Sequence, residues 1–121
     1  MTTGITKGTP GQIKWATDLV KKEVARLDKM LAPIPAKEDR SEISQKLYGE
    51  QIAFVKQVRN TMAGRIQSAK WVIDNRNNLF YYAASLLQKQ DPKFAARFPE
   101  SWSLPVITAV NDGTWLKGAG F

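Results

Sequence analysis

Apolar residues recur every three or four positions between Ile13 and Leu31, and this periodicity constrains the fold more than any other feature of the sequence. Because an α-helix has about 3.6 residues per turn, residues at this spacing share one face of a helix. The series predicts an amphipathic helix that buries its apolar face against the rest of the chain. Its apolar members are Ile13, Ala16, Val20, Val24, Leu27 and Leu31.

Both ends of this helix carry local signals. Thr9 can cap the first turn, Pro10 suits the first helical position, and Gln12 can complete a capping box with Thr9. Pro33 biases the residue before it away from the helical region, so the helix should end by Ala32.

A second apolar series predicts another long helix, starting near Arg40. Asp39 and Glu42 form a candidate capping box, and Ser41 is a rival cap. Gly64 disfavours a helix interior, yet the apolar pattern continues beyond it, so the second and third helices are either separate or one kinked rod. We expect the two long helices to lie antiparallel. The second apolar series is Ile43, Leu47, Phe54, Val55, Val58 and Met62.

Aromatic residues concentrate in the following stretch, from Ser68 to Leu87. Its apolar pattern predicts shorter helices over about 68–73 and 78–89. Asp91-Pro92 repeats the signal of a cap followed by proline, which predicts another short helix over 92–98.

A polar segment, Asp74-Asn75-Arg76-Asn77-Asn78, interrupts this aromatic stretch. Asn and Asp side chains can form hydrogen bonds to the backbone, so one interpretation of the segment is a helix junction. The alternative is a recognition point, in which Arg76 beside Asp74 binds a phosphate or carboxylate. The sequence leaves both interpretations open.

The C-terminal part changes in character. Residues 104–110 are rich in β-branched side chains, and Asn111-Asp112-Gly113 is a strong turn signal, which together predict a β-hairpin. The alternative is a tail packed on the helices. We expect a loose arm over 1–8 and one helical domain over 9–121, in which 99–121 form the hairpin or extended tail.

These features predict a mainly α fold with two long antiparallel helices, shorter aromatic-rich helices and a short C-terminal β-hairpin or tail. The hydrophobic content of 43% and the charged content of 24% are typical of a globular chain. There is no apolar run of about 18 residues and no apolar signal core at the N-terminus. We therefore expect a cytoplasmic protein without a membrane partner.

The composition argues against catalysis. The chain contains neither His nor Cys, so it lacks the usual general base near neutral pH and the best unassisted nucleophile. Most of the acidic residues fall at predicted caps or on exposed helix faces. No carboxylate cluster follows a metal-ligand pattern, and no glycine-rich phosphate loop follows a strand. We expect no enzyme activity, no cofactor and no metal.

The net charge of +7 favours a polyanionic partner, either a nucleic acid or an acidic protein surface. A helical basic face could track phosphates, whereas a solvated face partly neutralised by Asp18 and Glu23 is the simpler interpretation. The candidate binding cations are Lys21, Lys22, Arg26, Lys29, Lys56, Arg59, Arg65, Lys70 and Arg76.

Four tryptophans are present in the chain. Trp15 and Trp71 adjoin predicted buried stripes, so we expect both in the core. Trp102 and Trp115 lie in the C-terminal part, where they either fold back onto the helices or act as exposed anchors for a protein partner. Both are candidate binding residues under the second interpretation.

Two segments resemble stretches shared by small proteins of phages and mobile elements. In these proteins a Q-I-x-W-A helix start is followed by a W-x-I-D-N-R segment, matching residues 12–16 and 71–76 here. The resemblance implies a mobile-element setting, in which small accessory proteins bind host proteins or nucleic acid, and it transfers no functional residue.

The sequence thus predicts a non-enzymatic accessory protein that docks on a host or phage protein. The alternative is sequence-nonspecific nucleic-acid binding through the basic helix faces. Self-association into a homo-oligomer is a third partner hypothesis, because amphipathic helices can complete a core between copies.

Overall fold

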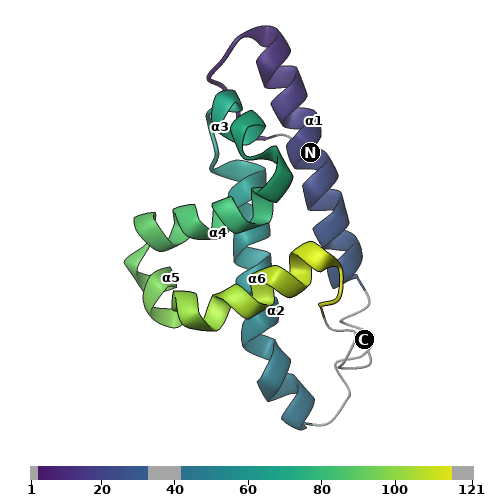
Figure 1. Ribbon diagram of the computed structural model, residues 1–121, viewed down its shortest axis with the longest axis vertical. Helices are drawn as coiled ribbons and strands as arrows, with labels where there is room; N and C mark the ends of the chain where they lie inside the picture. The colour runs from purple at the N-terminus through teal and green to yellow at the C-terminus, as the bar shows by residue number, and fades with distance from the viewer. Residues whose placement is uncertain (1–2, 33–41, 116–121) are drawn as a thin grey trace.

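Helices make up most of the described chain in a computed structural model of the protein (Figure 1). The structure describes the backbone of residues 3–32 and 42–115, and their side chains except those of 42–48. These ranges contain no strand, so the prediction of a mainly α fold is confirmed. None of the described helices combines the length and apolar character needed to cross a membrane. The elements are α1 (Pro10–Leu31), α2 (Glu42–Gly64), α3 (Ala69–Asp74), the 3-10 helix η2 (Arg76–Asn78), α4 (Leu79–Gln90), α5 (Pro92–Arg97) and α6 (Glu100–Asp112).

The predicted capping box opens α1. The Thr9 side chain accepts a hydrogen bond from the Gln12 backbone N–H at 3.2 Å, and Gln12 Oε1 accepts one from the Thr9 N–H at 3.0 Å. Pro10 is the first helical residue. The helix ends at Leu31 with Ala32 as its C-cap, as the following proline predicted.

The second long helix, α2, is described from Glu42 onward. The capping box predicted from Asp39, and its rival Ser41, fall outside the described residues. At its other end α2 stops at Gly64, and α3 begins at Ala69. These are therefore two separate helices rather than one kinked rod.

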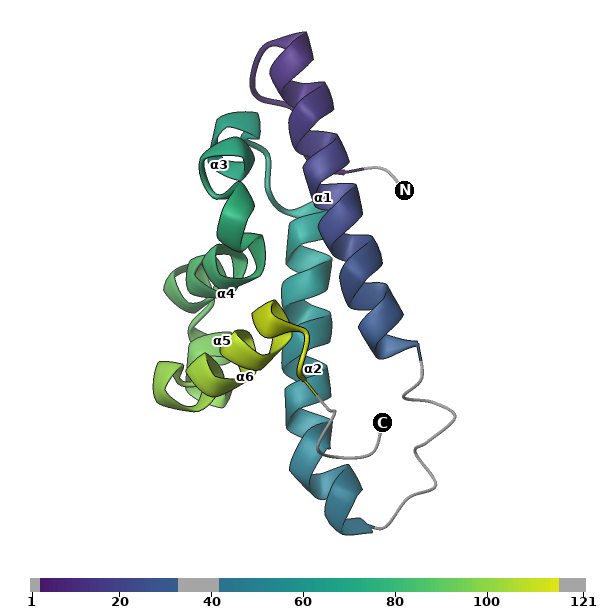
Figure 2. The same cartoon turned by 45° about the vertical axis from the view of Figure 1, so that its right-hand side comes forward.

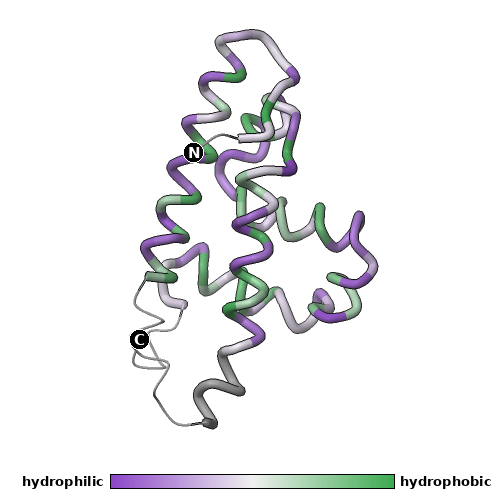
Figure 3. Tube along the Cα trace, turned by 180° about the vertical axis from the view of Figure 1, so that it is seen from behind, coloured by the Kyte–Doolittle hydropathy of each residue, from purple (hydrophilic) through white to green (hydrophobic). Residues whose placement is uncertain are grey.

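The long helices α1 and α2, of 22 and 23 residues, lie side by side with the chain running in opposite directions (Figures 1 and 2). Hydrophilic and hydrophobic residues alternate along α1 in Figure 3, as expected for an amphipathic helix. Eight apolar side chains of the two helices are almost inaccessible to solvent, so they are closely packed. They are Ala16, Val20, Val24 and Leu27 from α1 and Phe54, Val55, Val58 and Met62 from α2.

The N-terminal segment is not the loose arm predicted from its sequence. Within its described part, residues 3–8, the backbone N–H groups of Thr6 and Lys7 both donate to the Gln67 carbonyl at 2.9 Å. Ile5 is only 6% exposed and belongs to the core. One apolar side chain and the backbone hydrogen bonds hold this segment in place. The segment has no apolar periodicity, so its sequence did not indicate that it packs on the fold.

Phe54 on α2 is the centre of an aromatic core cluster. Its ring lies 5.6 Å from that of Phe94 and 5.4 Å from that of Phe98, measured between centroids. It also meets Phe80 edge to face at 6.0 Å and Trp102 at 5.7 Å. Since these partners come from the α4–α6 region, Phe54 joins the C-terminal helices to the long pair.

The predicted C-terminal hairpin is wrong, because residues 100–112 form the helix α6, with Pro105 inside it. The β-branched residues Val106, Ile107 and Val110 are buried, and packing of this face outweighs their modest preference for strands. The turn signal ends the helix instead. Gly113 has a φ of 72° and caps the C-terminus of α6 in the left-handed conformation that glycine favours.

Candidate functional site

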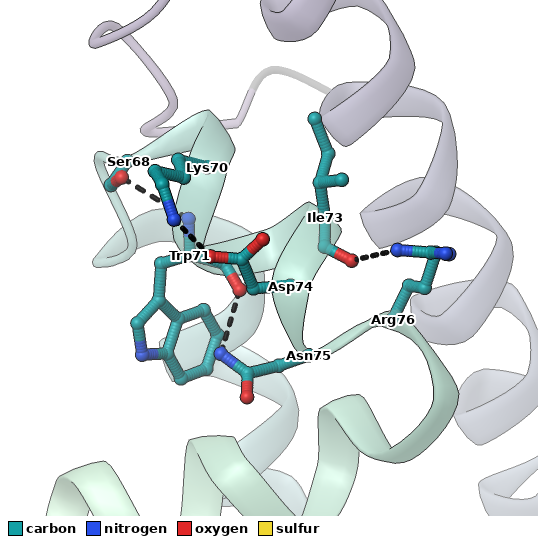
Figure 4. Close-up of polar contacts among 7 residues, drawn as sticks. All are labelled: Ser68, Lys70, Trp71, Ile73, Asp74, Asn75 and Arg76. Atoms are coloured by element: carbon teal, nitrogen blue, oxygen red, sulfur yellow. Dashed lines mark hydrogen bonds and ion pairs between the residues drawn. The ribbon is translucent and has the colours of Figure 1, made fainter.

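The polar segment between α3 and α4 is built as a helix junction (Figure 4). Asn75 Nδ2 donates to the Trp71 carbonyl at 2.7 Å, and Arg76 Nη1 donates to the Ile73 carbonyl at 2.6 Å. These bonds satisfy carbonyls in the last turn of α3. Lys70 forms an ion pair with Asp74 one turn along the same helix. The geometry therefore supports the junction interpretation of the segment.

Arg76 nevertheless has a second contact that reaches beyond the junction. Its guanidinium carbon lies 5.4 Å from the centroid of the Trp15 ring on α1. Trp15 is 48% exposed, contrary to the expectation that it lies in the core. It belongs to the Q-I-x-W-A segment and Arg76 to the W-x-I-D-N-R segment, so a cation–π contact joins the two stretches that carry the resemblance.

A surface hollow of about 510 Å³ opens beside this contact, between α1 and the chain that leads into α4. We call it the α1 hollow. Its lining is mostly apolar, although four cationic side chains take part in it, because long basic side chains also contribute their aliphatic stems. The lining residues are Leu19, Lys22, Glu23, Ala25, Arg26, Lys29, Arg76 and Leu79.

Helical spacing brings three of these cations together. Lys22, Arg26 and Lys29 are four and three positions apart, so they follow one face of α1. Arg26 is held in the hollow by Glu23, with which it forms an ion pair. Its Nη1 also donates to the Val110 carbonyl at 2.8 Å, in the last turn of α6. Lys22 and Lys29 are exposed.

Two other predicted binding cations take part in ion pairs. Arg59 binds both carboxylate oxygens of Asp28, and this hydrogen bonding raises the pKa of the Arg59 guanidinium despite its partial burial. Lys70 pairs with Asp74. These two cations contribute less net charge to a continuous basic face than the sequence alone indicates.

The remaining predicted cations are dispersed. Arg65 lines a different hollow, of about 230 Å³, together with Asp91 and polar side chains of α2. Lys21 and Lys56 are exposed and line neither of these two hollows. The structure thus brings Lys22, Arg26, Lys29 and Arg76 into one site and separates the others from it.

The two C-terminal tryptophans fold back onto the helices, which answers the question that their sequence left open. Trp102 is half-buried and lies 5.2 Å from Phe98 between ring centroids. Trp115 is 7% exposed, and its Nε1–H donates to Gln51 Oε1 at 3.0 Å. Their rings pack within the fold, so the interpretation as exposed anchors is wrong in this structure.

Comparison with known proteins adds no functional assignment, since no protein-family model, curated protein or solved structure gives a match to the chain. Among the described residues, no group of carboxylates has an arrangement that suits a metal ion. The α1 hollow is accordingly defined by its own chemistry, an apolar lining bordered by cations.

Proposed function

We propose that this chain is a non-enzymatic accessory binding protein of a phage or mobile element, and that it docks on a host or phage protein through the α1 hollow. The observation that carries the proposal is the convergence of four cations and apolar surface in one hollow. Protein interfaces commonly combine an apolar centre with a polar border. The mobile-element setting is supported by the two resembling segments, which meet at Trp15 and Arg76.

The acidic residues support a binding role rather than catalysis. Asp28, Glu50 and Asp74 each pair with a cation, and Asp91 caps α5 by accepting hydrogen bonds from two backbone N–H groups. These roles are structural. The chain also lacks His and Cys, and the one carboxylate that lines the hollow, Glu23, forms an ion pair with Arg26.

Sequence-nonspecific nucleic-acid binding is the alternative function, and the exposed Trp15 beside Arg76 favours it. Aromatic rings next to cations can stack the bases of single strands. The dispersal of the other cations weighs against it. Arg59 and Lys70 are paired, and Arg65 lines another hollow, so a phosphate track across α1 and α2 is interrupted.

A matched pair of variants tests the proposal. Lys22→Glu/Lys29→Glu reverses two charges in the α1 hollow, whereas Lys14→Glu/Lys21→Glu makes the same change at exposed positions of the same helix outside it. We expect wild type and the second variant to capture the same protein from host or phage-infected lysate, and the first variant to lose it. Equal capture by all three proteins would contradict the proposal.

Nucleic-acid binding is measured on the same three proteins. Under the docking hypothesis, the protein should not change the electrophoretic mobility of labelled single- or double-stranded DNA at low salt. Binding that weakens steeply with salt, and that the charge reversal in the hollow abolishes, would establish the alternative. Light scattering on the same samples measures self-association.

A further inference from the structure

We infer that the α1 hollow recognises an acidic peptide segment in extended conformation, with a bulky apolar side chain between two carboxylates. This inference rests on the proposed function and specifies the class of partner that the hollow would bind. Its basis is the combination of an apolar lining with separated cations of α1 and with Arg76, which belongs to η2.

The separation of the cations selects an extended anion over a compact one. Lys22 and Lys29 are seven positions apart on α1, which corresponds to about 10 Å along the helix axis at about 1.5 Å per residue. A single phosphate would draw its donors to one point. Carboxylates distributed along a peptide can instead meet each lysine separately, and long lysine side chains adjust to small differences in spacing.

Strand geometry gives the matching spacing on the peptide. Alternate residues of an extended chain point to the same side, and each residue advances about 3.3 Å. Acidic residues at the first and fifth positions of such a segment are therefore about 13 Å apart, within reach of the two lysines. The third residue points in the same direction, toward the apolar lining near Leu19 and Ala25.

The internal contacts of the arginines fit this arrangement. Arg26 lies between the two lysines and is held by Glu23 and the Val110 carbonyl, so Lys22 and Lys29 are left to meet the carboxylates of the peptide. Arg76 donates one bond to the Ile73 carbonyl, and a guanidinium has further N–H donors with which to bind a carboxylate. Both arginines are thus oriented before a ligand arrives.

A peptide fits the hollow better than a nucleic acid does. The Arg76 guanidinium lies over the Trp15 ring, and this contact competes with base stacking on that face. A duplex presents a broad surface, whereas this site is a hollow of about 510 Å³. That volume is in the range of small-molecule sites, about 300–1,000 Å³, and accommodates a large side chain with its flanking backbone.

The experiment uses the full chain and three fluorescein-labelled peptides. The first contains Glu-Ser-Leu-Ser-Glu, the second has Gln in place of both Glu, and the third has Ser in place of Leu. Fluorescence anisotropy at low and physiological salt should show that the first peptide binds at least about tenfold more tightly than either control. Each control removes one of the two features on which the inference rests.

Variants of the chain localise the binding. Lys22→Glu/Lys29→Glu should lower the affinity for the first peptide by at least about tenfold, whereas Lys14→Glu/Lys21→Glu should change this affinity by less than about twofold. Ala25→Gln places an uncharged side chain at an exposed position in the hollow and should also weaken binding. Circular dichroism confirms that each variant is folded.

Several outcomes would overturn the inference. An equal loss of affinity for the first peptide in both double variants would indicate attraction by net charge alone. Equal binding of all three peptides would show that the hollow recognises neither the carboxylates nor the apolar side chain. Hollow-dependent binding of labelled oligo-dT in preference to the peptide would assign the site to nucleic acid. If a protein is captured from lysate in a hollow-dependent manner while the peptide does not bind, docking stands and the peptide class is wrong.

Discussion

Arg59 on α2 binds Asp28 on α1 through two nitrogens, with Nε 2.9 Å from Oδ1 and Nη2 3.1 Å from Oδ2. The bidentate geometry strengthens the interaction. The side chains of Arg59 and Asp28 are 28% and 50% exposed, so solvent screening lowers its free energy. A double-mutant cycle with Arg59→Gln and Asp28→Asn should give a coupling free energy of about 0.5–1 kcal/mol. Urea unfolding at low and high salt measures it.

The control for this cycle is Arg65→Gln, at an exposed position directly after the C-terminal end of α2. Its effect on the free energy of unfolding should stay within about 0.5 kcal/mol. A coupling indistinguishable from zero at low salt would show that the contact contributes nothing to the association of α1 with α2.

Phe54 should be the most sensitive position of the aromatic core cluster. Phe54→Ala removes a fully buried ring that meets four other aromatic rings, and should lower the free energy of unfolding by about 3–5 kcal/mol. Phe54→Leu should cost less, because it leaves a smaller cavity. Chemical denaturation of both variants provides the measurement, and the leucine variant serves if the alanine variant does not fold.

Tyr82→Ala is the matched control, because Tyr82 is 40% exposed. It should cost about 1 kcal/mol or less. Similar losses at positions 54 and 82 would contradict the assignment of the core.

Local signals account for what the sequence predicted correctly. The start of α1 depends on Thr9, Pro10 and Gln12, which interact with one another within a single turn. The junction after α3 likewise uses bonds between near neighbours such as Asn75 and Trp71. Such contacts can be inferred without knowing how the chain packs.

Long-range packing decided the rest of the fold. The hairpin prediction failed because Val106 and Val110 are buried on a helix face, and burial outweighs local preference. The fixed segment around Ile5 depends on backbone bonds to Gln67, more than sixty positions away in the sequence.

The same distinction applies to the candidate site. The spacing of Lys22, Arg26 and Lys29 is visible in the sequence, but the addition of Arg76 to this group requires the fold. Trp15 illustrates a signal that could have been used. It lies between two positions of the apolar stripe without belonging to it, and this register predicts exposure.

Pro105 gives a direct test of the corrected C-terminal structure. In the interior of α6 a proline lacks the N–H that would complete a helical hydrogen bond. The side chain of Pro105 is exposed, so an alanine in its place loses little buried surface. Pro105→Ala should therefore increase the free energy of unfolding, by roughly 1–3 kcal/mol, and slightly increase helicity by circular dichroism. A loss of stability without gain in helicity would contradict a helical α6.

Two glycines should respond to alanine in opposite directions. A Cβ at Gly4 would lie 2.4 Å from the Gly64 carbonyl oxygen, so Gly4→Ala must displace backbone and should destabilise the fold by about 1–3 kcal/mol. A Cβ at Gly49, inside α2, would meet nothing within 4 Å. Gly49→Ala should therefore stabilise by about 0.5–1 kcal/mol.

Thermal and urea unfolding of these two variants provide the comparison. The two substitutions are chemically identical. Opposite signs of their effects on the free energy of unfolding would therefore reflect the close approach of Gly4 to the end of α2. Equal effects would contradict the fixed position of the N-terminal segment.

The contact between Glu50 and Arg97 predicts a pH effect with a defined sign. Arg97 donates hydrogen bonds to both carboxylate oxygens at 2.8 and 2.9 Å, and this bonding lowers the pKa of Glu50 below its ordinary value. A carboxyl whose pKa is lower in the folded state stabilises the fold above its unfolded pKa. That contribution disappears as the pH falls through the folded pKa.

Arg97→Gln should consequently raise the pKa of Glu50 toward its ordinary value, measured by NMR titration of the side-chain carboxyl carbon. Stability of the variant should also depend less on pH across the acidic range in which Glu50 titrates. The change should be small, because both side chains are largely exposed and solvent screens the pair. If the titration of Glu50 is the same in both proteins, the pair is not formed in solution.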